Sequence, residues 1–304
     1  MKRWASMFAG ISVFILLFGW GMTQPATRTA LSTIRWLPAL GALACATLSP
    51  VLHAWRWQRL LRVIRQPLSL SVAVHVTTWA TLSNYLIPGY AWAPVKGVVA
   101  RQIYGVRLAR AVPTLLLEQA LDVLGPLLAG LAGLALLPQA RRMSLATPSA
   151  AVAALLVVAV GILALAGWLA WRWSTRLQAW LSEAYQATRT LLRSPESYGW
   201  AFGLSLMRWT VDILSVWLAA AALHLALSVP AALLLAGAPV VAGMLVPIPG
   251  GLGVREASMV GLGYALGYPT GLIATLAVLA RGIALAGLGL AALVCQPWQE
   301  AGNG

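Results

Sequence analysis

Charged residues, and acidic ones above all, are scarce in this sequence. Of its 304 residues only 9% are charged, with 7 Asp or Glu against 21 Lys or Arg. A soluble domain carries roughly 25% charged residues, so this chain has too few charges to cover a surface that faces water. Together with a content of 60% hydrophobic residues, this scarcity excludes a soluble globular protein and predicts one whose solvent is mostly lipid.

The net charge of +14 would in another sequence suggest binding to nucleic acid. Here the basic residues lie in short clusters between apolar runs, as the cytoplasmic loops of membrane proteins do. We therefore expect no nucleic-acid partner.

Cysteine and histidine are also too sparse for several kinds of chemistry. Cys45 and Cys295 lie in apolar runs and predict no disulfide framework. The three histidines are dispersed without metal-ligand spacing, and no Ser/His/Asp or Cys/His arrangement is evident. We expect no metal, no cofactor and no catalytic residue. An intramembrane lipid-modifying enzyme stays a lesser alternative, because the pair Glu118 and Asp122 could perform acid–base chemistry.

The sequence consists mostly of long apolar runs. A membrane-spanning helix needs about 20 apolar residues. Two apolar regions, 69–107 and 230–268, are broken by proline and glycine, and each is typical of two short helices joined at a tip. We predict an all-α polytopic membrane protein, a single membrane domain over residues 1–304, with two broken re-entrant hairpins and about six full spans. These spans are 5–23, 36–54, 111–137, 148–170, 199–222 and 270–294.

Two polar segments have the pattern of amphipathic helices at the headgroup level of a membrane. In WRWQRLLRVIR, arginines 56, 59, 62 and 65 share one side, and residues 171–197 show the same interleaving of tryptophan, leucine and arginine. If the N-terminus is inside and each hairpin returns to the side it entered from, only Arg28, Arg35, Arg141 and Arg142 lie outside among the loop cations. We expect both termini in the cytoplasm and the protein in a bacterial cytoplasmic (inner) membrane.

The two breaks also indicate an internal repeat. Pro88-Gly89 and Pro249-Gly250 lie 161 positions apart, and the same offset carries two predicted spans of the second half onto two of the first. The repeat halves are about 1–137 and 148–294. One hairpin then enters from inside and the other from outside, which is the inverted-repeat architecture of many secondary transporters.

Ionisable residues at membrane depth are costly and therefore candidates for function. Glu118 and Asp122 share a helix face, and the offset of 161 places Arg281 opposite them, so Arg281 or Lys96 is the expected partner. Structural ion pairs that bind nothing are the alternative, above all for Arg208 with Asp212. The candidate charged residues are Lys96, Arg208, Arg255, Arg281, Glu118, Asp122, Asp212 and Glu256.

The second break, LVPIPGGLGVREAS, carries the clearest site. Its glycines permit tight turns, and a helix that begins near Val254 would point its free N–H groups into a polar cavity. Arg255 adds a guanidinium suited to phosphate, and Glu256 could restrain it when no ligand is bound. No P-loop lysine follows, and glycines for helix packing are the alternative. The predicted binding residues at the two breaks are Asn84, Pro88, Gly89, Pro249, Gly250, Gly251, Gly253, Arg255 and Glu256.

The stretch PIPGGLGVREAS, with SNYLIPGYAWAPVKGVVARQIY before it, resembles the lysylphosphatidylglycerol synthase transmembrane region family, also called flippase-like or UPF0104 proteins. The resemblance implies movement of lipid between leaflets. Larger members add a soluble domain for aminoacyl transfer, which we do not expect here. One departure is Tyr90-Ala91-Trp92-Ala93, where members commonly carry further glycine.

These patterns predict a flippase-like transporter for a phospholipid, a polyprenyl-linked lipid or another anionic lipid, with membrane lipid as its substrate partner. Two alternatives stay open. One is a small-solute secondary transporter built on the same repeat. The other is a non-transporting membrane partner of a lipid-modifying enzyme.

Overall fold

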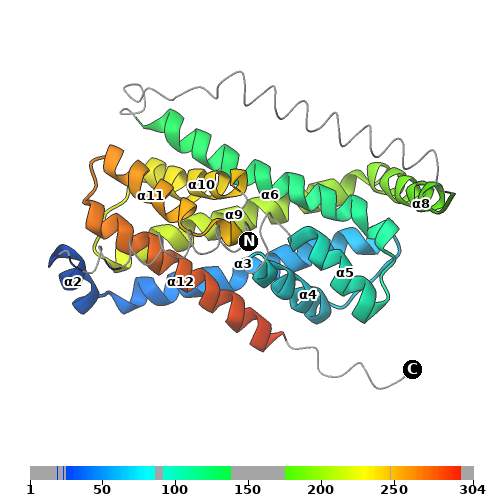
Figure 1. The fold of residues 1–304 in the computed structure, drawn as a ribbon, viewed down its shortest axis with the longest axis horizontal. Coiled ribbons are helices and arrows are strands. Elements are labelled where there is room, and N and C mark those ends of the chain that lie inside the picture. The colour runs from blue at the N-terminus through cyan, green and yellow to red at the C-terminus, as the bar shows by residue number, and fades with distance from the viewer. Residues whose placement is uncertain are drawn as a thin grey trace, which may run out of the picture.

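The computed structural model describes residues 25–85, 92–137, 175–246 and 248–295, together with Gly19 and Thr23. Within these residues every regular element is a helix (Figure 1), which confirms the predicted all-α class. The predicted span at 148–170, almost all of the span at 5–23, and Pro88 and Gly89 of the first break lie outside the described residues.

Four helices are long and apolar enough to cross a membrane: α3 (Trp36–Val63), α6 (Leu108–Leu136), α9 (Pro195–Ala222) and α12 (Thr270–Val294). They confirm four of the six predicted spans. Large apolar side chains such as Leu37, Leu131, Leu206 and Leu293 are more than half exposed on these helices. Such a surface is stable in hydrocarbon, where an exposed leucine carries no penalty.

Each broken apolar region forms two short helices, as predicted. The first gives α4 (Leu70–Ser83) and α5 (Trp92–Tyr104). The second gives α10 (Val229–Leu245), the 3₁₀ turn η2 (Pro249–Gly251) and α11 (Val254–Ala265). The described chain also contains α2 (Pro25–Ser32) and α8 (Thr175–Leu192).

The succession long, short, short, long therefore occurs twice, as α3–α6 and as α9–α12. Local details repeat as well. Arg65 after α3 and His224 after α9 both have a φ of 58°, which is uncommon for a residue other than glycine. Ser69 caps α4 by accepting from the Val72 amide, and Ser228 caps α10 in the same way. The backbone thus follows one local path twice.

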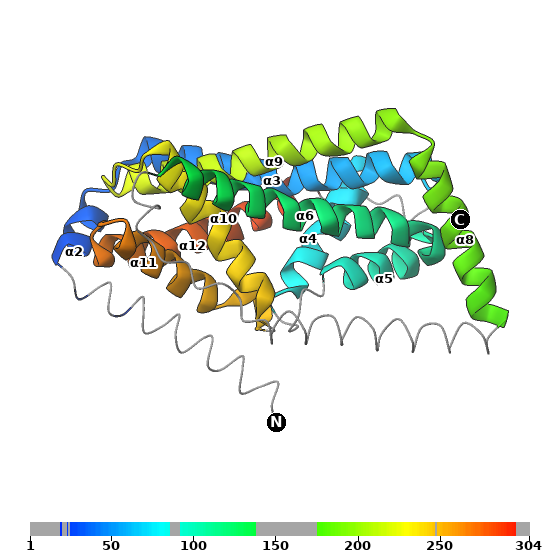
Figure 2. The same cartoon turned by 90° about the horizontal axis from the view of Figure 1, so that it is seen from above.

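The two hairpins lie beside opposite halves of the long helices, α4–α5 along one half and α10–α11 along the other (Figures 1 and 2). They meet where each helix pair turns. A Cβ atom added to Gly250 would lie 2.9 Å from the ring of Tyr85, two residues after the end of α4. The turn of the second hairpin is therefore in contact with the end of α4.

The predicted surface helix at Arg56–Arg65 is wrong. Helix α3 continues without a break to Val63, and Arg56 and Trp57 are both fully buried. Burial of Arg56 is tolerated because two carboxylates meet its guanidinium, while Trp57 Nε1 donates to Thr114 Oγ1 at 3.2 Å.

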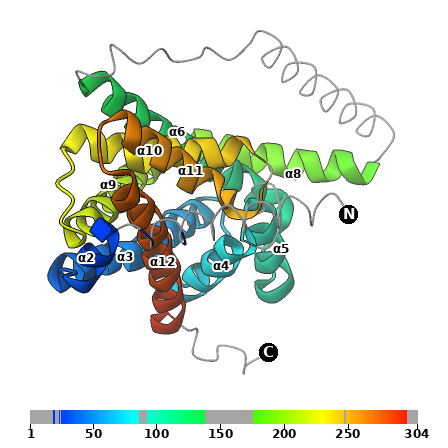
Figure 3. The same ribbon diagram turned by 60° about the vertical axis from the view of Figure 1, so that its left-hand side comes forward.

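The second polar segment does form a helix. In α8, Ala187 and Leu191 are buried against the bundle, while Glu183 pairs with Arg110 Nε of α6 at 2.8 Å. Figure 3 shows α8 extending beyond α6 at the edge of the bundle, as an amphipathic helix at a membrane surface would.

Helices α6 and α10 approach closely because glycines line their contact. A Cβ atom on Gly237 of α10 would lie 2.6 Å from the Gly130 nitrogen and would also meet the Pro126 carbonyl oxygen. Both are backbone atoms, which cannot move aside as a flexible side chain can. Small residues allow such approach between membrane helices, where packing rather than hydrophobicity drives association.

We predict that Gly237→Ala destabilises the protein although Gly→Ala within a helix ordinarily stabilises by about 0.5–1 kcal/mol. Separating α6 from α10 should cost about 1–3 kcal/mol, as overpacking does elsewhere. Thermal unfolding in detergent measures the effect. Gly289→Ala of α12 is the matched control, because nothing lies within 4 Å of its added Cβ. Equal unfolding temperatures for the two variants would contradict the close contact.

Candidate functional site

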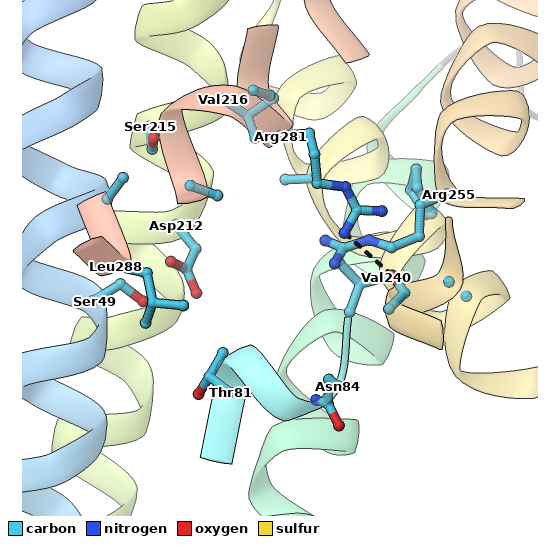
Figure 4. Close-up of a pocket in the computed structure, with 18 of the residues that line it drawn as sticks. Ser49, Thr81, Asn84, Asp212, Ser215, Val216, Val240, Arg255, Arg281 and Leu288 are labelled. Atoms are coloured by element: carbon cyan, nitrogen blue, oxygen red, sulfur yellow. Dashed lines mark hydrogen bonds between the residues drawn. The ribbon is translucent and has the colours of Figure 1, made fainter. Parts of the chain in front are cut away.

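A cavity of about 280 Å³ lies where both hairpins meet the four long helices (Figure 4). Each of these elements contributes to its wall. Polar lining residues include Ser49 of α3, Thr81 of α4, Asp122 of α6, Asp212 and Ser215 of α9, Arg255 of α11 and Arg281 of α12. Apolar residues such as Val240 and Leu288 complete the lining, so the cavity combines charged and polar groups with an apolar frame.

The polar groups are divided between two walls. Figure 4 shows Asp212 beside Ser49 on one side, while Arg255 and Arg281 lie together on the other. The cavity therefore has a carboxylate on one wall and two guanidinium groups on the facing wall.

The second break supports the cationic wall through its glycines. Gly250, Gly251 and Gly253 have φ angles of 60°, 62° and 78°, in the left-handed region that side chains disfavour. A Cβ atom on Gly251 would also lie 2.9 Å from the Gly243 Cα. The predicted need for tight turns and close approach at this motif thus agrees with the geometry, and α11 begins at Val254 as predicted.

Glu256 stabilises the cationic wall, which Arg255 and Arg281 form. Its Oε2 accepts from the Gly253 amide at 2.7 Å, and its Oε1 accepts from Arg281 Nε at 2.8 Å. Arg281 Nη1 in turn donates to the Gly250 carbonyl at 3.1 Å and to the Tyr85 hydroxyl at 3.5 Å. One arginine therefore ties α12 to the second break and to the end of α4.

These contacts correct one prediction. Arg281 does not face Glu118 and Asp122: its carboxylate partner is Glu256. Arg281 lies at the end of the cavity near α11, where Glu256 is within reach. A different arginine lies beside Glu118 and Asp122.

That arginine is Arg56. It donates from Nε to Glu118 at 3.2 Å, from Nη2 to Asp122 at 2.8 Å and from Nη1 to the Ser205 hydroxyl at 2.7 Å. It is fully buried, and its neighbour His53 has Nε2 3.4 Å from Glu118 Oε1. Sequence reasoning missed both residues, because the spacing of Arg56 with Arg59 and Arg62 matches an amphipathic surface helix.

Lys96 completes the pairing of Glu118, as predicted. Its Nζ donates to Glu118 Oε2 at 2.8 Å and lies 4.3 Å from the centre of the Trp57 ring. A buried ammonium is tolerated there because a carboxylate and an aromatic face both stabilise its charge.

Arg208 and Asp212, predicted as a local pair, do contact each other, but only at 3.7 Å. The shorter contact of Arg208 runs from Nη1 to Asp122 Oδ1 at 2.6 Å. Asp122 therefore forms the shortest ion-pair contacts of both Arg56 and Arg208, whereas the contact of Asp212 with Arg208 is longer.

The remaining predicted residues fall at the breaks themselves. Asn84 lines the cavity, and its Oδ1 accepts from the Trp92 amide at 2.9 Å, which joins the end of α4 to the start of α5. Pro249 is buried in η2. Around the cavity and the adjoining cluster, the described cations Arg56, Lys96, Arg208, Arg255 and Arg281 outnumber the carboxylates Glu118, Asp122, Asp212 and Glu256 by one.

Comparison with known proteins identifies one relationship. The model of the family described as Lysylphosphatidylglycerol synthase TM region matches residues 7–292. No curated protein and no solved structure gives a significant match. The matched range covers both hairpins and the whole cavity, and it confirms the resemblance that the residues around the two breaks predicted.

We predict that Arg56→Gln lowers the free energy of unfolding by roughly 3–5 kcal/mol, the usual effect of breaking a buried ion pair. Glu118 and Asp122 would lose their shared partner while still buried. Thermal unfolding in detergent measures this, with the exposed Arg62→Gln of the same helix as control. Adding Glu118→Gln to Arg56→Gln should deepen the loss, because it removes the carboxylate that buried Lys96 Nζ contacts at 2.8 Å. An Arg56→Gln protein as stable as the Arg62→Gln control would refute this role.

Proposed function

Since the chain belongs to the lysylphosphatidylglycerol synthase transmembrane region family, we propose that it is a flippase-like transporter that moves a lipid with a phosphate-bearing headgroup between membrane leaflets. We place it in a bacterial cytoplasmic membrane with both termini in the cytoplasm. The proposal assigns the chain no enzymatic step of its own.

The observation that carries the proposal is the cationic wall of the cavity. Arg255 and Arg281 converge at the start of α11, beside a glycine turn that brings the backbone close. Guanidinium groups bind phosphate through paired N–H donors, and a helix N-terminus adds a positive field. The excess of one cation among the described groups around the cavity favours an anionic group on the ligand.

The dimensions of the cavity favour a headgroup over a whole lipid. A volume of about 280 Å³ holds a polar headgroup but no acyl chains. The chains would stay in the bilayer, against the outward apolar surfaces of the long helices. The same volume also suits a small solute, so a secondary transporter of a soluble anion is the second candidate function.

We further propose that the two four-helix units are inverted relative to each other in the membrane. The repeated succession of elements and the meeting of the hairpin ends support this arrangement. In inverted-repeat transporters the site lies between the repeats, and rocking of one repeat against the other opens it to alternate sides. Because residues of both units line the cavity, it would lie in such a position.

Glu256 has a place in this cycle. Its carboxylate already accepts from Arg281 and from the Gly253 amide, two donors that a phosphate oxygen would otherwise meet. We propose that it stands in for the ligand when the cavity is empty.

The decisive variant is Arg255→Ala, which we expect to reduce transport at least tenfold while the protein stays folded. Arg255→Lys should retain part of the activity, because the charge survives but the planar fork does not. Transport of a labelled phospholipid in proteoliposomes measures the rate, with thermal unfolding measured on each variant. Wild-type transport by a stable Arg255→Ala protein would overturn the headgroup site. A wild-type protein that moves no lipid would instead favour the solute transporter or a non-transporting partner of a lipid-modifying enzyme.

The inverted arrangement is tested by single-cysteine labelling in a protein whose Cys45 and Cys295 have been replaced. Cysteines placed at Tyr90 and Leu252, one at each break, should react slowly with membrane-impermeant reagents. Each should be reached more readily from the face that its hairpin enters, so the two should differ in sidedness. Rapid labelling of both from one face would rule out the inverted repeat.

A further inference from the structure

Asp212 differs from the other carboxylates around the cavity. Glu118, Asp122 and Glu256 each have a cationic partner within 2.8 Å, and their side chains are at most 6% exposed. Asp212 is 3.7 Å from its partner Arg208, and its side chain is 29% exposed. Asp212 lines the cavity, so the carboxylate with the longest ion-pair contact is one that a ligand would meet.

Besides Arg208 at 3.7 Å, two hydroxyl groups lie near Asp212. Ser49 lies beside it and donates a hydrogen bond to its carboxylate, and Ser215 lies on the same helix one turn above. Both serines line the cavity, and their oxygen lone pairs can accept from a ligand (Figure 4). The Ser215 hydroxyl donates its proton to the Ala42 carbonyl at 2.9 Å, so its oxygen lone pairs are left to accept. A carboxylate with neighbouring hydroxyl oxygens suits a group that donates several hydrogen bonds and carries positive charge.

The facing wall has the opposite character, since Arg255 and Arg281 present guanidinium groups. A simple anion would bind there but would place its charge in the same small cavity as Asp212. A simple cation would bind Asp212 but would face two arginines. A ligand that carries both charges gives each wall a group of opposite sign.

We propose that the ligand is zwitterionic, with a phosphate at Arg255 and Arg281 and a primary ammonium at Asp212. This deepens the proposed function and rests on it. The two walls bound one cavity of about 280 Å³, which suits a small headgroup that carries both charges. An ethanolamine-type headgroup, with two carbons between phosphate oxygen and nitrogen, is of this kind.

Three donors on the ammonium distinguish this chemistry from a choline-type headgroup. A trimethylammonium has the charge but no N–H groups for Asp212, Ser49 and Ser215. A glycerol-type phosphate headgroup has the anion but no cation. The order expected for the wild-type protein is therefore ethanolamine-type first, with the other two slower.

The test measures movement of acyl-labelled phosphatidylethanolamine, phosphatidylglycerol and phosphatidylcholine in separate proteoliposome assays, for the wild type and for Asp212→Asn, Asp212→Glu and Glu183→Gln. Glu183 lies on α8 outside the cavity and serves as the control. We expect Asp212→Asn to slow phosphatidylethanolamine at least tenfold and to speed phosphatidylglycerol, because repulsion of its phosphate is removed. Asp212→Glu should recover part of the preference, and Glu183→Gln should match the wild type.

The outcomes separate the two proposals. Equal rates for phosphatidylethanolamine and phosphatidylglycerol in the wild type, or equal slowing of both by a folded Asp212→Asn protein, would overturn the zwitterionic ligand alone. No movement of any lipid would overturn the proposed function with it. Uptake of soluble phosphoethanolamine in place of lipid movement would keep the two-charge recognition but assign it to a free solute.

Discussion

The structure depends on how charge is buried in an apolar bundle. Arg56 lies within α3 with no exposed surface, and it is held there by Glu118 and Asp122 of α6. Removing any one of these three groups would leave a charge in a medium that cannot solvate it. The cluster therefore fixes α3 and α6 relative to each other, and through Lys96 and Arg208 it extends to α5 and α9. Asp122 and Arg208 belong to this cluster and also line the cavity, so the cluster supports that part of the cavity wall.

The second half has a corresponding pair with the signs exchanged. In the first unit Lys96 of the second short helix binds Glu118 of the following long helix. In the second unit Glu256 of the second short helix binds Arg281 of the following long helix. Both pairs attach a hairpin to the long helix that follows it, so their structural role is the same. The exchange of sign has a chemical result: the long helix of the pair carries a carboxylate in the first unit and a guanidinium group in the second, and that guanidinium group lines the cavity.

Much of this arrangement could be predicted from the sequence, and the failures have a common cause. The four long helices, the two broken hairpins and the start of α11 follow from local signals such as apolar length, Pro-Gly breaks and glycine before a helix. The partners of Arg56 and Arg281 do not, because a pairing between helices depends on packing that the periodicity of one helix does not encode. The arginines of α3 show this clearly: Arg56 is buried and Arg62 exposed, although they lie six residues apart in one polar pattern. The ion pair between Lys96 and Glu118 was predictable, because so few charged residues lie at membrane depth that each has few possible partners.

The contact between the hairpins bears directly on the proposed ligand site. Arg281 binds Glu256 and the Gly250 carbonyl in its own unit, and the Tyr85 hydroxyl in the other. A phosphate that took donors from Arg281 would compete with these contacts, and so would change how firmly the second break is held against the end of α4. In the proposed transporter, ligand affinity and the relative position of the two units would thus be linked through one guanidinium group. A ligand shifts an equilibrium between two arrangements only by the difference in its affinity for them. Arg281 would provide such a difference in affinity, because the ligand and the contact between the two units would compete for the same guanidinium group.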